Sequence, residues 1–134
     1  MLLDTDVLID VALDRYPHSE SSTELLDRVE RGVGRAFVAW HTLSNLYYLV
    51  TPARGNADTR DFIAELVRFV SVAPADTLAL RYAVSLPIPD FEDAMQVAAA
   101  RACGAEHIVT RNVRDFRRSP IPAMTPGEAL LRLF

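Results

Sequence analysis

Residues 2–10 read L-L-D-T-D-V-L-I-D, and this stretch contains the transition on which the fold prediction rests. Residues 1–5 form a short apolar run that leads into an aspartate, which is typical of a buried β-strand. Residues 6–13 are mainly apolar and precede Pro17, so they predict a short helix that ends before this proline. The stretch therefore predicts a strand that passes directly into a helix.

The rest of the chain repeats this alternation of short apolar strands with helices. Further strands are expected at residues 35–39, 71–73, 107–110 and 122–124. Further helices are expected from about residue 19 to about residue 32 and at residues 42–50, 58–70, 76–85, 90–103 and 126–133. The alternation predicts one α/β domain over residues 1–134, a three-layer α/β/α sandwich with a central, mostly parallel sheet of roughly four or five strands.

The composition excludes several classes of protein. Of the 134 residues, 50% are hydrophobic and 24% are charged, which is close to average for a globular protein. All 14 cationic residues are arginines, so mechanisms that need a lysine are excluded, including P-loop nucleotide hydrolysis, Schiff-base chemistry and response-regulator receivers. The D-T-D-V sequence at residues 4–7 matches the nucleophile motif of haloacid-dehalogenase-like phosphatases only superficially, since those enzymes also require a lysine.

Charge and cysteine content constrain the partners and the location. The net charge of −4 argues against a wholly basic surface for duplex DNA, although a local arginine patch remains compatible with it. Cys103 is the single cysteine and cannot form an internal disulfide, so we expect a reducing cytoplasm. No apolar run approaches the roughly 20 residues of a membrane span, and no signal peptide is recognisable, so we expect no membrane association.

Acidic and polar residues lie where the sequence places the carboxyl edge of the expected sheet. In a parallel sheet the chemistry lies at the carboxyl ends of the strands. The polar residues at these places are Asp4 and Asp6 after the first strand, Asp90 and Asp93 at the start of the 90–103 helix, and Thr110, Asn112 and Asp115 after the 107–110 strand. Several carboxylates at one sheet edge predict a functional cluster.

These aspartates also have purely structural interpretations. Asp4 and Asp90 are well placed to cap the helices that follow them, and for Asp90 capping is favoured over metal binding. Asp93 heads an otherwise apolar helix, so its carboxylate is expected to point toward a polar site. Asp10 and Asp14 are expected to be solvated.

The acidic cluster predicts a divalent metal site. Carboxylates held together in a partly buried cleft repel one another unless a cation neutralises them. The chain has no cysteine cluster and three histidines, so the available ligands are hard oxygens, which favour Mg²⁺ or Mn²⁺ over zinc. Because Mg²⁺ commonly joins carboxylates to a phosphate, the pattern predicts phosphodiester hydrolysis.

Three segments together resemble the PIN domain: residues 2–10, D-F-E-D-A-M-Q-V-A-A-A at residues 90–100, and I-V-T-R-N-V-R-D-F at residues 108–116. Their order and separations match, and the resemblance covers essentially the whole chain. VapC-type ribonuclease toxins are the small stand-alone members of this family. The resemblance therefore implies a metal-dependent endoribonuclease that forms a homodimer and is inhibited by an antitoxin whose tail occupies the cleft. The apolar segments 43–50 and 62–69 are candidates for the partner surface, although burial within the domain explains them equally well.

The resemblance also implies roles for individual residues. Asp4, Asp93 and Asp115 would be metal-binding carboxylates. Thr110 and Asn112 would hold a water or a carboxylate through hydrogen bonds. Family members differ over whether the third acid lies where Asn112 or where Asp115 falls, so both residues are named.

Two positions differ from the commonest pattern of the family. Asp6 stands where asparagine is frequent, and it is expected to orient the first loop. Asn45, within T-L-S-N-L-Y-Y-L at residues 42–49, stands where the family usually has a glutamate. An amide can still bind a metal through its carbonyl or steady a water, so three interpretations stay open: one firmly held metal, a second metal bound only with substrate, or lost activity. We favour altered metal use; the alternative function is a degenerate, non-catalytic PIN domain that binds RNA or a protein partner.

Four arginines, Arg111, Arg114, Arg117 and Arg118, fall within eight residues beside the expected metal site. The arginine fork matches the geometry of a phosphate, so we expect these side chains to bind the substrate backbone. The family resemblance favours single-stranded or looped RNA as that substrate. An ordinary solvated loop with ion pairs is the alternative. His41 is interpreted as a helix-start residue without a catalytic role.

Overall fold

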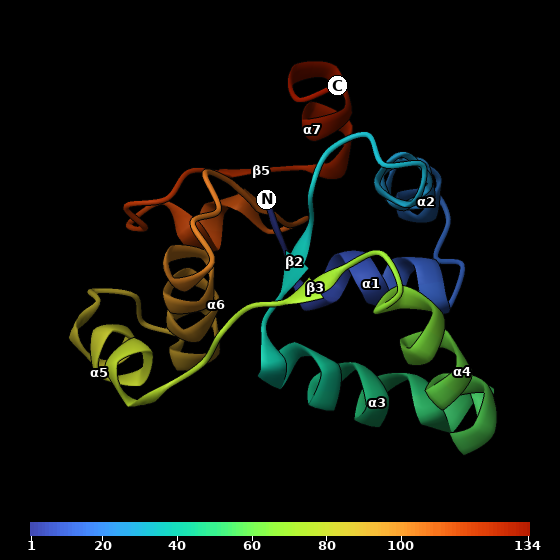
Figure 1. The fold of residues 1–134 in the computed structure, drawn as a ribbon, viewed down its shortest axis with the longest axis horizontal. Coiled ribbons are helices and arrows are strands. Elements are labelled where there is room, and N and C mark those ends of the chain that lie inside the picture. The colour runs from blue at the N-terminus through green and yellow to red at the C-terminus, as the bar shows by residue number, and fades with distance from the viewer.

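The computed structural model describes residues 1–134 and confirms an α/β architecture with a central sheet (Figure 1). All five strands lie in one sheet in the order β3-β2-β1-β4-β5, and every neighbouring pair is parallel. The strands are β1 (Leu2–Leu3), β2 (Phe37–Val38), β3 (Ser71–Val72), β4 (Ile108–Val109) and β5 (Ala123–Met124). The first strand of the chain is central, so its end is flanked by the ends of β2 and β4.

Seven α-helices connect and cover the strands. They are α1 (Thr5–Ala12), α2 (His18–Glu30), α3 (Trp40–Arg54), α4 (Asn56–Leu66), α5 (Thr77–Ser85), α6 (Phe91–Ala102) and α7 (Pro126–Arg132). A short 3₁₀ helix, η1 (Val113–Phe116), follows β4. In Figure 1, α5 and α6 lie to the left of the sheet, and α1, α3 and α4 lie to its right, which gives the expected three layers. None of the helices combines the length and the apolar character that crossing a membrane requires.

The two faces of the sheet bury two separate hydrophobic clusters. Successive residues of a strand point to opposite faces. Leu3 and Val109 therefore enter the cluster that also contains residues of α1 and α2, whereas Leu2 and Ile108 enter the cluster that contains residues of α6. All four side chains are fully buried. Two residues in each of these strands are enough to anchor both layers.

The sequence predicted the type and order of every α-helix and strand, but several boundaries differ. The strands are shorter than expected, and the 3₁₀ helix η1 was not predicted. Helix α3 runs beyond the expected 42–50 segment, includes Pro52 and ends at Arg54. The C-cap is Gly55, whose φ of 83° is a conformation that glycine adopts without strain. Helix α4 ends at Leu66 instead of continuing to residue 70, because the chain turns there to bury Val70 before β3.

Truncation of a buried leucine tests the packing of α2. Leu25 is fully buried in the cluster that α2 shares with α1 and α7, so Leu25→Ala should lower the free energy of unfolding by about 2–5 kcal/mol. Leu131 on α7 is 85% exposed, so the control Leu131→Ala should change that free energy by less than about 0.5 kcal/mol. Urea denaturation followed by circular dichroism measures both variants. Equal losses of stability in the two variants would contradict this packing.

Candidate metal centre

The register between β1 and β4 brings two distant segments together at the carboxyl edge of the sheet. Leu3 pairs with Val109, so the residues that follow them, Asp4 and Thr110, lie side by side. The Asp4 N–H donates to the Val109 carbonyl at 2.9 Å, and Thr110 Oγ1 donates to Asp4 Oδ2 at 2.8 Å. Both side chains are buried. Parallel strand pairing therefore positions the first acidic residue of the site.

Asp4 is surrounded by hydrogen-bond donors. Its Oδ1 accepts from the Thr5 N–H at 2.8 Å, at the start of α1, and from Gln96 Nε2 at 3.0 Å. Burial and then the negative charge of Asp6 raise the pKa of Asp4 to about 7, although the hydrogen bonds from Thr110 and Thr5 lower it. A carboxyl group with this pKa is only partly ionised at neutral pH, and a nearby cation favours its charged form.

Asp6 connects the start of α1 to the segment that follows β4. Its Oδ2 accepts from Thr110 Oγ1 at 3.2 Å, from the Arg111 N–H at 3.1 Å and from Asn112 Nδ2 at 3.2 Å. Its Oδ1 is buried and has no hydrogen-bond partner. Burial is the main cause that raises the pKa of Asp6. Asp6 Oδ2 thus holds the segment after β4, whereas Asp6 Oδ1 has no hydrogen-bond donor beside it.

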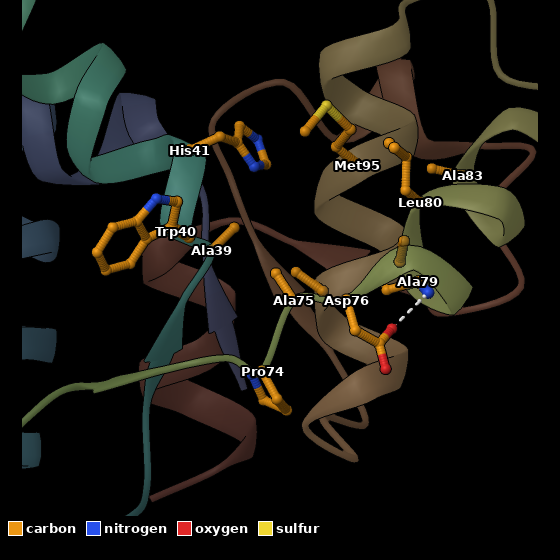
Figure 2. A pocket seen from close by; sticks show the side chains of 12 residues that line it. Ala39, Trp40, His41, Pro74, Ala75, Asp76, Ala79, Leu80, Ala83 and Met95 are labelled. Carbon is orange, nitrogen blue, oxygen red and sulfur yellow. Dashed lines mark hydrogen bonds between the residues drawn. The ribbon is translucent and has the colours of Figure 1, made fainter.

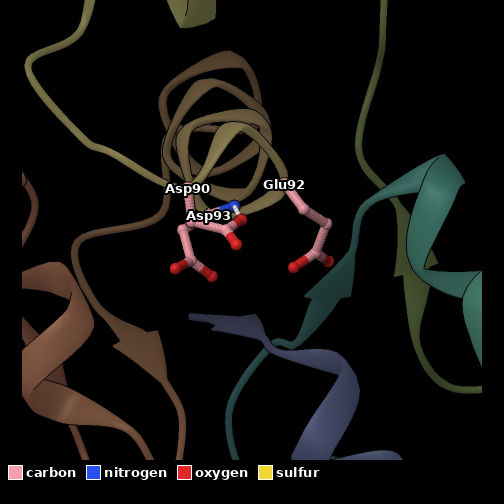
Figure 3. Close-up of side chains that lie close together, drawn as sticks. All are labelled: Asp90, Glu92 and Asp93. Atoms are coloured by element: carbon pink, nitrogen blue, oxygen red, sulfur yellow. Dashed lines mark hydrogen bonds between the residues drawn. The ribbon is translucent and has the colours of Figure 1, made fainter.

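Three acidic residues lie at the start of α6: Asp90 at the N-cap, and Glu92 and Asp93 in the first turn. Asp90 caps the helix by accepting the Asp93 N–H at 3.0 Å, in agreement with the capping interpretation. One oxygen from each of the three carboxylates lies within 4.8 Å of the others. Burial, followed by the charges of Asp90, Glu92, Asp115 and Asp6, raises the pKa of Asp93 to about 6. Figure 3 shows the three carboxyl groups directed away from α6 and toward the segment that contains β1 and the start of α1.

A cleft of about 340 Å³ joins the start of α6 to η1. It is lined by Pro89, Asp90, Asp93, Arg114, Asp115, Arg117 and Arg118. Three of the four arginines expected to bind phosphate therefore share a cleft with Asp93 and Asp115. We call Arg114, Arg117 and Arg118 the cleft arginines. A cationic wall beside carboxylates can hold the backbone of a nucleic acid against an acidic centre.

Asp10 and Arg111 form a buried ion pair that the sequence did not predict. Asp10 was expected to be solvated, which is wrong: it is fully buried, and its Oδ2 lies 2.7 Å from Arg111 Nε. Arg111, which was grouped with the phosphate-binding arginines, does not line the cleft. The reason is the helical period, because Asp6 and Asp10 are four residues apart on α1 and both face the segment after β4. Asp14 is exposed, as expected.

Sequence reasoning passed over two residues of the site, Gln96 and Glu92. Gln96 is fully buried on α6, and its Nε2 donates to Asp4 Oδ1, to Thr42 Oγ1 at 2.8 Å and to Glu92 Oε1 at 3.4 Å. A signal was present in the sequence, because Glu92, Asp93 and Gln96 are spaced by three and four residues on a mostly apolar helix. That spacing places them on one side of α6.

Helix α3 reaches the site through Asn45 and His41. Asn45 Nδ2 donates to Glu92 Oε1 at 3.4 Å, and His41 Nε2 lies 3.3 Å from the same oxygen. Asn45 therefore faces the acidic residues from the α3 side. His41 also contacts the site, in addition to its place in the first turn of α3.

The residues at this edge fit a divalent cation. The side-chain donors that converge on the edge are mainly carboxylate oxygens, which suit Mg²⁺ or Mn²⁺ better than a soft metal. Asp4 and Asp93 have raised pKa values because burial and neighbouring negative charges penalise ionisation, and a divalent cation offsets both causes. The buried, unpartnered Oδ1 of Asp6 is a further oxygen without a hydrogen bond.

A second hollow, of about 230 Å³, lies between the start of α3, the segment before α5, and α6 (Figure 2). Nine of its 12 lining residues are hydrophobic, and they include Trp40, Leu80 and Met95. Its one acidic residue, Asp76, caps α5 by accepting the Ala79 N–H at 2.8 Å. The hollow therefore offers an apolar surface and no set of ligands for a cation.

Solved structures of VapBC proteins share this fold. A chain of VapBC2 from Rickettsia felis, bound to a DNA fragment from their promoter, matches with a TM-score of 0.72 at 16% identity, over 92% of this chain and 96% of that chain. A chain of DNA-bound VapBC from Salmonella typhimurium matches with a TM-score of 0.70 at 20% identity, over 93% and 96% of the two chains. VapC20 from Mycobacterium tuberculosis, described as a Sarcin-Ricin loop cleaving toxin, matches with a TM-score of 0.62 at 16% identity, over 80% and 85%. At these identities the likeness establishes a shared fold.

Sequence comparison adds a family assignment. No curated protein matches the sequence significantly. The family model described as the PIN domain matches residues 1–114, a range that includes Asp4, Asp93 and Thr110. The resemblance of the three sequence segments is thereby confirmed, and the chain belongs to the PIN-domain family.

Proposed function

We propose that this chain is a divalent-metal-dependent endoribonuclease that hydrolyses RNA phosphodiester bonds, acting in the cytoplasm as the toxin of a VapBC-type pair. The observation that carries the proposal is the cleft in which Asp93 and Asp115 lie beside the cleft arginines, with the buried carboxyl group of Asp4 at the carboxyl edge of the same sheet. Membership of the PIN-domain family supports a metal-dependent nuclease. One protein of the same fold is described as cleaving the Sarcin-Ricin loop, which supports RNA as the substrate. Residues 1–134 act as a single domain in this proposal.

The proposed ligands of Mg²⁺ or Mn²⁺ are Asp4, Asp93 and Asp115. They come from the end of β1, the start of α6 and η1, so the cation joins three parts of the chain that the sheet brings to one edge. When bound, the cation supplies the positive charge that activates a water and offsets the charge developing on the phosphate.

The surrounding residues hold these ligands and the substrate. Thr110 Oγ1 donates to Asp4 and Asp6, and Asn112 Nδ2 donates to Asp6, so the segment after β4 keeps a fixed position beside the first acidic residue. The cleft arginines bind phosphates on either side of the cut bond. Arg111 stays paired with Asp10, so it fixes the conformation of the segment after β4 and does not bind the RNA.

A non-catalytic PIN domain is the second candidate function. The observation that favours it is Asn45, which brings an amide to the site from α3 where a carboxylate would add a charge. Such a protein binds RNA through the cleft arginines and does not cut it. Cleavage assays therefore separate the two candidates.

The proposed partners are an antitoxin and a second copy of this chain. VapBC structures of the same fold contain complexes, which supports a protein partner here. The helix faces considered from the sequence differ in exposure: Phe62 packs against the core, whereas Tyr48 and Leu49 on α3 are exposed. Trp40 at the start of α3 is exposed as well, so the exposed apolar side chains of α3 form the proposed partner surface.

Removal of a single carboxylate tests the nuclease. Asp4→Asn and Asp93→Asn should each reduce cleavage by orders of magnitude while the protein stays folded, because each change removes a charge that the cation needs. The assay incubates a pool of single-stranded and structured RNA with purified protein in Mg²⁺, Mn²⁺ or EDTA. Asp14→Asn, at an exposed position, is the control and should cleave like the wild type. Full activity in both site variants would refute the assignment, and a wild type that cuts with neither metal would favour the non-catalytic candidate.

The pH dependence of stability tests the buried carboxyl group of Asp4. Its pKa is raised from 3.8 to about 7 in the folded state, so the folded protein binds more protons than the unfolded chain across this range. Without a cation, the free energy of unfolding of the wild type relative to Asp4→Asn should therefore fall as the pH rises from about 4 to about 7, by up to about 4 kcal/mol. Urea titrations in EDTA at several pH values measure this difference. A difference that grows with pH would contradict the raised pKa, and Mn²⁺ should reverse the trend by binding the ionised form.

Substitution of the cleft arginines tests the RNA-binding surface. Arg117→Gln and Arg118→Gln should each weaken binding of single-stranded RNA and reduce the slope of log K against log salt by about 0.7 for each lost phosphate contact. The control is Arg68→Gln, since Arg68 pairs with Glu65 at 2.9 Å and does not line the cleft. Fluorescence anisotropy over a range of KCl concentrations, in the Asp93→Asn background, measures both quantities. Slopes equal to that of the control would place the RNA elsewhere.

A further inference from the structure

We infer that Glu92, at the start of α6, supplies the metal centre with the carboxylate that α3 lacks at Asn45, and so acts as an additional acidic ligand of the cation. This inference rests on the proposed function, because it concerns the same site. It also explains how the site keeps its negative charge although the residue that faces it from α3 is neutral.

The first step is the position of Glu92 between the two helices. Its Oε1 accepts hydrogen bonds from Asn45 Nδ2 of α3 and from Gln96 Nε2 of α6, each at 3.4 Å. One oxygen of the carboxylate also lies within 4.8 Å of oxygens of Asp90 and Asp93. Figure 3 shows the Glu92 side chain extending from α6 to the side of Asp93 that faces α3, with its carboxyl group at the level of the other two.

The second step is the charge of Glu92. All hydrogen bonds that it accepts come from neutral amides and end on Oε1, so Oε2 accepts none from the protein. The one ion-pair contact of the carboxylate is with His41, at 3.3 Å. No arginine pairs with Glu92, although Asp93, the next residue of α6, shares a cleft with the cleft arginines. The carboxylate is therefore held in place by neutral amides and His41, and no arginine compensates its charge.

The third step is Gln96, which links Glu92 to the buried carboxyl group of Asp4. The residue is fully buried, its Nε2 donates to Asp4 and to Glu92, and its Oε1 has no hydrogen-bond partner. The amide is thus oriented with its donor toward two carboxylates from different elements. A shared donor keeps Asp4 and Glu92 close together, and their mutual repulsion contributes to the raised pKa of Asp4. Two anions held side by side in this way suit a cation that contacts both.

A structural role for Glu92 makes a different prediction from a ligand role. If Glu92 only accepts the hydrogen bonds of Asn45 and Gln96, then Glu92→Gln preserves metal binding, because the amide oxygen of glutamine still accepts both bonds. If Glu92 binds the cation, the same change removes a charge and weakens binding while leaving the shape intact.

The experiment measures Mn²⁺ binding by the full chain with isothermal titration calorimetry, together with the melting temperature with and without Mn²⁺. Glu92→Gln should weaken Mn²⁺ binding by at least the roughly 10–100-fold that loss of a residue hydrogen-bonded to a ligand causes. It should also diminish the rise in melting temperature that Mn²⁺ causes, with the metal-free melting temperature retained. The control Glu106→Gln removes an exposed carboxylate outside the site and should bind Mn²⁺ like the wild type. The double variant Asn45→Glu/Glu92→Gln returns the charge from the α3 side and should recover most of the affinity.

The outcomes separate this inference from the proposed function. Loss of Mn²⁺ binding in Asp93→Asn together with wild-type binding in Glu92→Gln overturns the role of Glu92 and leaves the metal site in place. A wild-type chain that binds no Mn²⁺ overturns both. If Glu92→Gln lowers the metal-free melting temperature, the double variant decides: recovered affinity supports the ligand role, and unrecovered affinity overturns it.

Discussion

The hydrogen bond from Thr110 Oγ1 to Asp4 Oδ2 joins the end of the central strand, β1, to the end of its neighbour β4, and the acidic centre is arranged around it. It forms because β1 and β4 pair in parallel with Leu3 opposite Val109, so residues 106 positions apart end at the same edge of the sheet. The same pairing brings the segment after β4 to Asp6. Two further residues of the site are linked to Asp4 from the flanking helices. Gln96 of α6 bonds Asp4 directly, and Asn45 of α3 is linked to it through Glu92 and Gln96.

Burial of the carboxyl groups raises their pKa values, and it lowers the stability of the folded protein when they are ionised. Carboxyl groups such as Asp4 and Asp93 ionise reluctantly because water is excluded and other acids are near. Protonation of these groups is therefore favoured at low pH, and under the proposed function a cation takes the place of the protons at neutral pH. The arginines divide accordingly: Arg111 neutralises the buried Asp10, whereas the cleft arginines stay at the open side where a polyanion can approach.

The sequence predicted the fold well because each element carries a local signal. Short apolar strands, proline and glycine boundaries and the N-cap at Asp90 are properties of neighbouring residues. The ion pair of Asp10 was missed because an aspartate on a short amphipathic helix gives no local indication of which arginine it meets. The helical spacing of Glu92 and Gln96 was visible in the sequence, but their contacts were not. Those contacts are with Asp4 and with α3, which lie more than 40 residues away in the chain.

Diffraction from crystals grown with Mn²⁺ tests the central claim most directly, since the anomalous signal locates the ion without reference to activity. The account predicts an anomalous peak at the carboxyl edge of the sheet, within about 2.0–2.6 Å of carboxylate oxygens of Asp4 and Asp93. Above pH 7 the site should be filled, because Asp4 is then mostly ionised. No peak at this edge under those conditions, with the carboxylates in place and the protein saturated with Mn²⁺, would contradict the account.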